Sequence, residues 1–140
     1  MIVNTAYIYM GRGGGVPGNP VIFSQNEINY KYTGRNFKIT SDGYIEMDSN
    51  SELMFEKLDL TTFEQLAVKA QNGYPRTLSL TANVIDSSGN VSSDFKLEFL
   101  GAQTRTKRFN IPPEFKKTNV KIKFSLGGSG ALTLQSAILS

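Results

Sequence analysis

Apolar and polar residues alternate with a period of two through most of the second half of the chain. In "TLSLTANV" the apolar positions are Leu78, Leu80, Ala82 and Val84, and the polar positions between them are Ser79, Thr81 and Asn83. Residues 95–99 and 120–126 repeat this alternation. Successive side chains of a strand point to opposite faces, so the pattern predicts strands with one buried face.

Turn residues separate these runs at regular intervals. Residues 41–43 and 86–90 are typical of hairpin turns, Pro112 and Pro113 end a strand, and residues 127–130 link the final pair of strands. Helical spacing is confined to residues 61–66, for which we expect one capped turn. The series predicts an all-β fold over residues 36–140: an antiparallel β-sandwich with jelly-roll-like topology.

The first 35 residues depart from this alternation, and we expect them to form a glycine-rich arm used in assembly. Gly13 to Gly18 match the dinucleotide-binding pattern G-x-G-x-x-G. That pattern needs a helix to begin within the loop, and Pro17 and Pro20 oppose one. We therefore expect no nucleotide cofactor. The expected assembly contacts include Arg12, Gly13, Gly14, Gly15 and Pro17.

The composition narrows the chemistry. The 140 residues carry a net charge of +3 and include neither Cys nor His. Disulfides, thiolate metal sites, His-based triads and the usual zinc ligand are therefore excluded, and we expect no metal site and no cofactor. A structural calcium ion on oxygen ligands such as Asp42, Asp48, Asp59 or Asp86 stays an open alternative, although no calcium-loop spacing is present. No export signal or membrane-spanning run is visible, so we expect synthesis in the cytoplasm and no membrane partner.

Two functional alternatives follow from the charged residues. The acidic side chains Glu46, Asp48, Glu52 and Glu56 offer carboxylate pairs for a polysaccharide-cleaving enzyme. The basic stretch 104–123 offers electrostatic binding of nucleic acid. Its lysines alternate with apolar residues and lack stacking aromatics, which favours the solvated face of a sheet over a nucleic-acid site.

The tyrosines suggest a carbohydrate site. A sugar presents a flat C–H face to an aromatic ring, while its hydroxyls need fixed polar partners. Tyr44 and Tyr74 are expected outside the core, and Arg76, Asn83 and Arg105 are the candidate polar contacts. An exposed tyrosine that merely covers a turn or a sheet edge is the competing interpretation.

Residues 40–140 resemble the carbohydrate-binding-module-like, galactose-binding-like β-sandwiches found in bacteriophage virion proteins. The resemblance lies in "LDLT" at residues 58–61, "LAVKA" at residues 66–70, and the order of the later strands. It implies a non-enzymatic structural or accessory module of a tail, baseplate or capsid decoration, located in the virion. The implied partners are other virion subunits, further copies of the chain (a trimer is one option) and a cell-surface polysaccharide.

Overall fold

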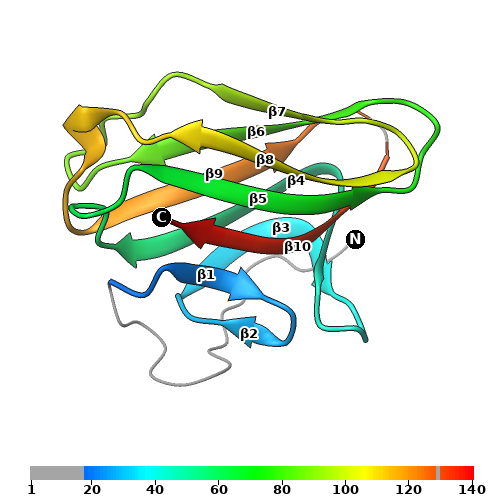
Figure 1. The fold of residues 1–140 in the computed structure, drawn as a ribbon, viewed down its shortest axis with the longest axis horizontal. Helices are drawn as coiled ribbons and strands as arrows, with labels where there is room; N and C mark the ends of the chain where they lie inside the picture. Colours follow the sequence, from blue (N-terminus) through cyan, green and yellow to red (C-terminus); the bar gives the residue numbers. More distant parts are fainter. Residues whose placement is uncertain (1–17, 129) are drawn as a thin grey trace.

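The computed structural model describes residues 18–128 and 130–140, which form an antiparallel β-sandwich of two sheets. The front sheet contains, in spatial order, β2 (Glu27–Ile28), β1 (Val21–Ser24), β10 (Leu132–Leu139), β5 (Gln65–Asn72) and β8 (Gln103–Asn110). The back sheet contains β3 (Tyr32–Ile39), β4 (Ile45–Leu58), β9 (Val120–Leu126), β6 (Leu78–Ile85) and β7 (Phe95–Phe99). Figure 1 shows the front sheet toward the viewer and the back sheet behind it.

The two sheets are joined through β10 and β4, which are inner strands of their sheets. The first residues of β10 pair with β4, with Leu132 opposite Met47 and Leu134 opposite Ile45. One short 3₁₀ turn, η1 (Pro113–Phe115), follows β8, where Pro112 ends the strand. Within the described residues, no helix has the length and apolar character needed to cross a membrane.

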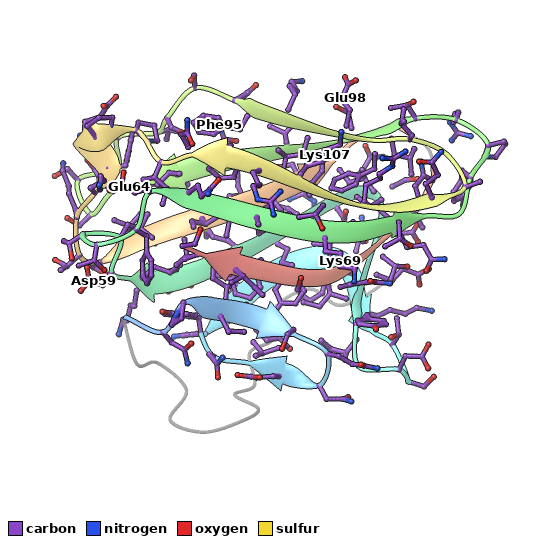
Figure 2. The ribbon with its side chains drawn as sticks, in the orientation of Figure 1. Asp59, Glu64, Lys69, Phe95, Glu98 and Lys107 are labelled. Atoms are coloured by element: carbon purple, nitrogen blue, oxygen red, sulfur yellow. The ribbon has the colours of Figure 1, made fainter. Side chains whose placement is uncertain are left out.

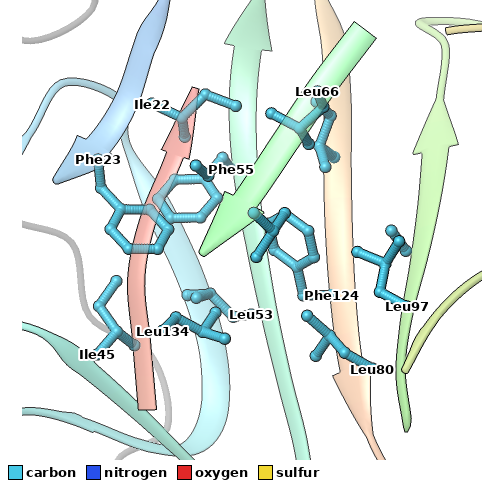
Figure 3. Packing of buried hydrophobic residues seen from close by; sticks show 14 of the residues in the cluster. Ile22, Phe23, Ile45, Leu53, Phe55, Leu66, Leu80, Leu97, Phe124 and Leu134 are labelled. Carbon is cyan, nitrogen blue, oxygen red and sulfur yellow. The ribbon is translucent and has the colours of Figure 1, made fainter. Parts of the chain in front are cut away.

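The alternation in the sequence correctly predicts the buried faces. The alternating apolar positions of β6 (Leu78, Leu80, Ala82 and Val84) and those of β9 are buried, and Leu97 and Phe99 of β7 join them in one core between the sheets. Figure 3 shows this core in close view, with Phe23, Phe55 and Phe124 near its centre. Phe23 stacks on Phe55 across the sandwich with ring centroids 5.6 Å apart. The prediction of an antiparallel β-sandwich is therefore confirmed.

Residues 21–35, expected to lie in the arm, contribute strands to the sandwich. Both β1 and β2 belong to the front sheet, and β3 begins at Tyr32. Phe23 and Tyr30 are fully buried, and the Tyr30 hydroxyl donates a hydrogen bond to the carbonyl of Asn19 at 2.7 Å. Burial raises the pKa of Tyr30 to about 12. The glycine-rich positions 11–17 lie outside the described residues, so the arm itself stays a prediction.

Two further segments differ from the expected pattern. Residues 61–66 form a turn and the start of β5 instead of a helical turn, because the N–H groups of Glu64 and Gln65 donate to the carbonyl of Ser140. The runs at 43–47 and 52–60 are joined in one 14-residue strand, β4. Positive φ angles at Asn50 (57°) and Lys57 (62°) accompany the irregularities in this strand.

A buried carboxylate organises the β6–β7 loop. Asp86 accepts hydrogen bonds from the backbone N–H groups of Ser88 (3.0 Å) and Asn90 (2.9 Å). Its other oxygen accepts from the Asn90 side-chain amide and from Lys117 Nζ, at 3.0 and 3.1 Å. The hydrogen bond from the Asn90 side chain, together with those from the backbone and Lys117, holds the pKa of Asp86 well below 3.8.

Replacing Asp86 by asparagine is expected to lower the melting temperature by several degrees at pH 7. A carboxyl group whose pKa is lower in the folded state contributes its full stabilisation above its ordinary pKa, and this contribution decreases progressively as pH falls from about 4 toward the lowered pKa of the folded protein. The difference between the variant and the parent protein should therefore narrow as pH falls toward 3. Thermal unfolding followed by circular dichroism from pH 7 to pH 3 measures this, with Asp42→Asn in an exposed turn as control. A difference that stays constant over this pH range would contradict the assignment.

Candidate functional site

Three loops meet at the end of the sandwich that lies to the right in Figure 1. They are the β5–β6 loop (residues 73–77), the β7–β8 turn (100–102) and the β9–β10 loop, described at residues 127, 128, 130 and 131. The buried side chain of Asn72, the last residue of β5, holds the first two together. Its Nδ2 donates to the carbonyls of Arg76 (2.7 Å) and Phe99 (2.9 Å), and its Oδ1 accepts the N–H of Tyr74 at 2.9 Å.

The β7–β8 turn packs directly against the β5–β6 loop, which contains Tyr74. The N–H of Ala102 donates to the carbonyl of Tyr74 at 2.9 Å. A Cβ at Gly101 would lie 2.5 Å from the same carbonyl, closer than real Cβ contacts come. Only glycine therefore allows this approach of the two loops, and the backbone around Tyr74 is fixed from both sides.

Tyr74 and Arg76 are side chains of the β5–β6 loop that lie at the exposed end of these two loops. The Tyr74 side chain is partly exposed, and the Arg76 guanidinium carbon lies 5.2 Å from its ring centroid. Such cation–π contact favours a fixed ring orientation. An aromatic ring held in place by a rigid backbone and an arginine is suited to contact a flat apolar ligand face.

A hollow of about 380 Å³ adjoins Arg76, and we call it the loop-end hollow. It lies along β6 and β7 on the back sheet, and the β9–β10 loop closes one side of it. Its lining consists of Arg76, Thr77, Leu78, Ser79, Thr81, Lys96, Gly127 and Gly128. Hydroxyl groups and two cations thus surround a small apolar area, so the hollow offers both hydrogen-bond donors and acceptors.

The structure brings together only two of the five residues predicted for a carbohydrate site. Tyr74 and Arg76 are in contact, and of the five only Arg76 lines the loop-end hollow. Tyr44 is half-buried in the β3–β4 turn, where its N–H donates to Thr40 Oγ1. Arg105 lies on β8 opposite Ala70, and its Nε donates to the Gln103 side chain.

Asn83 lies on the outward face of β6, as the alternation predicts, but the segment before β7 covers it. Its side-chain amide donates to the carbonyl of Ser92 (3.3 Å) and to Asp94 Oδ1 (2.8 Å). Its donors are therefore directed at the protein. A role of Tyr44, Asn83 or Arg105 in ligand binding stays a prediction.

Sequence reasoning missed the residues that give the site its shape. Asn72 precedes a glycine at a strand end, which indicates a turn but does not reveal that its amide reaches a carbonyl 27 residues away. Ser79, Thr81 and Lys96 appear only as the polar positions of two strands. The register that places Thr81 opposite Lys96 is a property of the fold.

The acidic residues considered for catalysis lie on the back sheet, and two of them are ion-paired there. Glu46 pairs with Lys38 at 3.3 Å, and Glu52 pairs with both Arg35 (2.8 Å) and Lys123 (3.5 Å). Across residues 18–128 and 130–140, no group of three or more acidic side chains is placed to hold a metal ion.

Comparison with known proteins relates the fold to carbohydrate-binding modules. The sequence matches no protein-family model and no curated protein. The structure of the carbohydrate-binding module CBM36, in complex with calcium and xylotriose, aligns with a TM-score of 0.60 and 16% identity over 80% of this chain and 94% of that chain. A mutant of CBM29-2, a family 29 module, aligns with a TM-score of 0.61 and 13% identity over 86% of this chain and 89% of that chain.

Modules and parts of larger proteins both share this fold. CsCBM6-3 from Clostridium stercorarium, in complex with cellobiose, aligns with a TM-score of 0.56 and 11% identity over 80% of this chain and 88% of that chain. PfGH50B aligns with a TM-score of 0.65 over 79% of this chain but only 22% of its own length. This chain therefore spans about a fifth of that protein. At these identities the likeness establishes the fold of a carbohydrate-binding-module β-sandwich and nothing further.

Proposed function

We propose that this protein is a non-enzymatic carbohydrate-binding module that holds a saccharide against Tyr74 beside the loop-end hollow. The observation that carries the proposal is the exposed Tyr74 ring, whose backbone is held by Asn72 and which contacts Arg76, a residue that also lines a hollow rich in hydroxyl groups. The fold shared with solved carbohydrate-binding modules adds support. The set of polar groups around the hollow is of the kind that fixes a ligand's orientation.

The proposed binding mode divides the saccharide between two surfaces. The C–H face of one sugar ring lies on the Tyr74 ring, and its hydroxyls reach the Arg76 guanidinium and the side chains of Thr77 and Ser79. No bond is broken in this mode. The ion pairs of Glu46 and Glu52 are structural contacts of the back sheet in this proposal, in place of the carboxylate pair that cleavage would need.

Replacing Tyr74 by alanine is expected to weaken polysaccharide binding at least tenfold. Loss of the ring removes the stacking surface, and stacking contacts of this size are worth about 1–3 kcal/mol. Tyr74→Phe should retain most of the affinity because it keeps the ring. Affinity electrophoresis in gels containing xylan, β-glucan, mannan or dextran, followed by calorimetry on the bound polysaccharide, measures the effect.

Tyr44→Ala is the matched control for this experiment. It removes the other tyrosine proposed for the site but leaves the loop-end hollow unchanged, so its binding should equal that of the parent protein. Equal binding by Tyr74→Ala and the parent, or binding to none of the four polysaccharides, would refute the proposed site.

We further propose that the protein is part of a virion, as predicted from the sequence. This proposal comprises assembly through residues 1–35, a homo-oligomer and a location in a tail or capsid. Its support is the resemblance of residues 40–140 and the glycine-rich start of the chain. Light scattering of the full chain measures the self-association that it requires.

A further inference from the structure

The charges of the two sheets are distributed differently. β5, β8 and β10, which are neighbours in the front sheet, contain no Asp or Glu, and their basic residues are Lys69, Arg105, Lys107 and Arg108. The bases of the back sheet, by contrast, include Arg35, Lys38 and Lys123, which are ion-paired with acids of β4. The front sheet thus presents cations with no acid on the same strands.

The strand register places Lys69 and Arg108 on the same outward face. Ala67 lies between Arg108 on one side and Ile138 on the other, and Lys69 lies between Thr106 and Ser136 in the next outward row. Lys69 and Arg108 are therefore diagonal neighbours, whose Cβ atoms are typically about 7–8 Å apart. Figure 2 shows Lys69 on β5 toward the viewer. Arg105 and Lys107 alternate to the other side of β8, opposite Ala70 and Val68.

Small side chains between the two cations leave a groove of about 310 Å³. Ala67, Thr106, Ser136, Ile138 and Ser140 line it together with the two cations. In the part of the chain that the structure describes, neither Lys69 nor Arg108 has an ion-pair partner. Two like charges at this spacing repel each other, and an anionic group between them would relieve the repulsion.

We propose that this groove of the front sheet binds an acidic saccharide unit, one that carries a carboxylate or a sulfate group. The guanidinium of Arg108 and the ammonium of Lys69 would hold the anion, since charge-assisted hydrogen bonds are stronger than neutral ones. The hydroxyls of Thr106 and Ser136 would contact the sugar. The groove has no aromatic ring on which a base could stack, which favours a saccharide over a nucleic acid.

The inference rests on the proposed carbohydrate-binding function but uses a different face from Tyr74. The test uses two pairs of polysaccharides that differ mainly in charge: dextran sulfate with dextran, and polygalacturonate with its methyl ester. Affinity is measured for the full chain, Lys69→Ala/Arg108→Ala and Tyr74→Ala at near-physiological salt. Lys121→Ala/Arg35→Ala removes the same charge from the back sheet and is the matched control.

The double variant Lys69→Ala/Arg108→Ala is expected to lose at least tenfold in affinity for an acidic polysaccharide, with no change toward a neutral one. Binding of the sulfated chain alone, or of the carboxylated chain alone, identifies the anion. An equal loss in the back-sheet control would overturn the proposal, because it would indicate net charge alone. Tighter binding of single-stranded DNA than of either acidic polysaccharide, or no binding of either, would also overturn it.

The outcomes for the two faces are distinguishable. If Tyr74→Ala retains all binding while the front-sheet variant loses acidic polysaccharide, the loop-end site is wrong and the groove stands. If only Tyr74→Ala loses binding, the groove is wrong and the loop-end site stands. Circular dichroism of each variant shows whether it is folded, and Lys69→Gln/Arg108→Gln provides a second uncharged pair that keeps more of each side chain than alanine does.

Discussion

Replacing Phe55 by alanine is expected to lower the free energy of unfolding by about 3–5 kcal/mol, the range for removal of a buried aromatic side chain. Phe55 is fully buried on β4, and its ring lies near three others, those of Phe23, Tyr32 and Phe124. It therefore connects β1 of the front sheet to β3 and β9 of the back sheet. The cavity left by alanine would be lined by rings that belong to both sheets and cannot close readily. Urea unfolding followed by circular dichroism measures the loss.

Met54 provides the control for this prediction because it directly precedes Phe55 on the same strand. Its side chain points to the opposite face and is only half-buried. Met54→Ala should cost much less than Phe55→Ala. Similar losses in the two variants would mean that the contacts between the sheets do not depend on Phe55.

Replacing Asn72 by alanine is expected to lower the free energy of unfolding by about 2–4 kcal/mol and to weaken binding at Tyr74 as well. The substitution leaves the carbonyls of Arg76 and Phe99 and the N–H of Tyr74 without their partner, and an unsatisfied buried group costs about 1–3 kcal/mol. Stability is measured by urea unfolding, and binding is measured by calorimetry with the polysaccharide that the parent protein binds.

Gln71→Ala is the matched control, since Gln71 precedes Asn72 on β5 but is exposed. It should leave both stability and binding unchanged. Asn72→Asp tests the individual hydrogen bonds: it keeps the acceptor for the Tyr74 N–H but loses both donors. Unchanged unfolding of Asn72→Ala would show that the two loops keep their positions without this side chain.

The strands of the second half of the chain could be predicted because their burial is local in origin. Each alternating run has one apolar face, and the core accepts that face directly, as for Leu80 and Ile122. The first strands could not be recognised in this way. Phe23 ends a short apolar run without alternation, Tyr30 and Tyr32 stand among polar residues, and the buried Tyr30 hydroxyl has the carbonyl of Asn19 as its acceptor.

The sequence allowed the exposure of individual site residues to be predicted, but not their positions relative to one another. The exposure of Tyr74 follows from its place in an Asn-Gly-Tyr-Pro turn. Its contact with Arg76 and the adjoining hollow depend on loops that come from residues 73–77, from residues 100–102, and from residues 127, 128, 130 and 131, which only the strand order brings together. Asn83 illustrates the reverse case, because alternation places it outside whereas a later segment covers it.

The central position of β10 in the front sheet has a consequence for how the chain folds. β10 (residues 132–139) pairs with β1 and β5, and its first residues also pair with β4. Strands from residues 21–24, 45–58 and 65–72 therefore all pair with this one strand near the C-terminus. Until that element docks, β1 and β5 each keep an unpaired edge that can pair with another chain. Contacts between residues so distant in sequence are slow to form, and all-β domains of this kind fold in milliseconds to seconds. Protection of backbone amides in the front sheet should therefore appear late and together during refolding, because no half of that sheet is complete without β10.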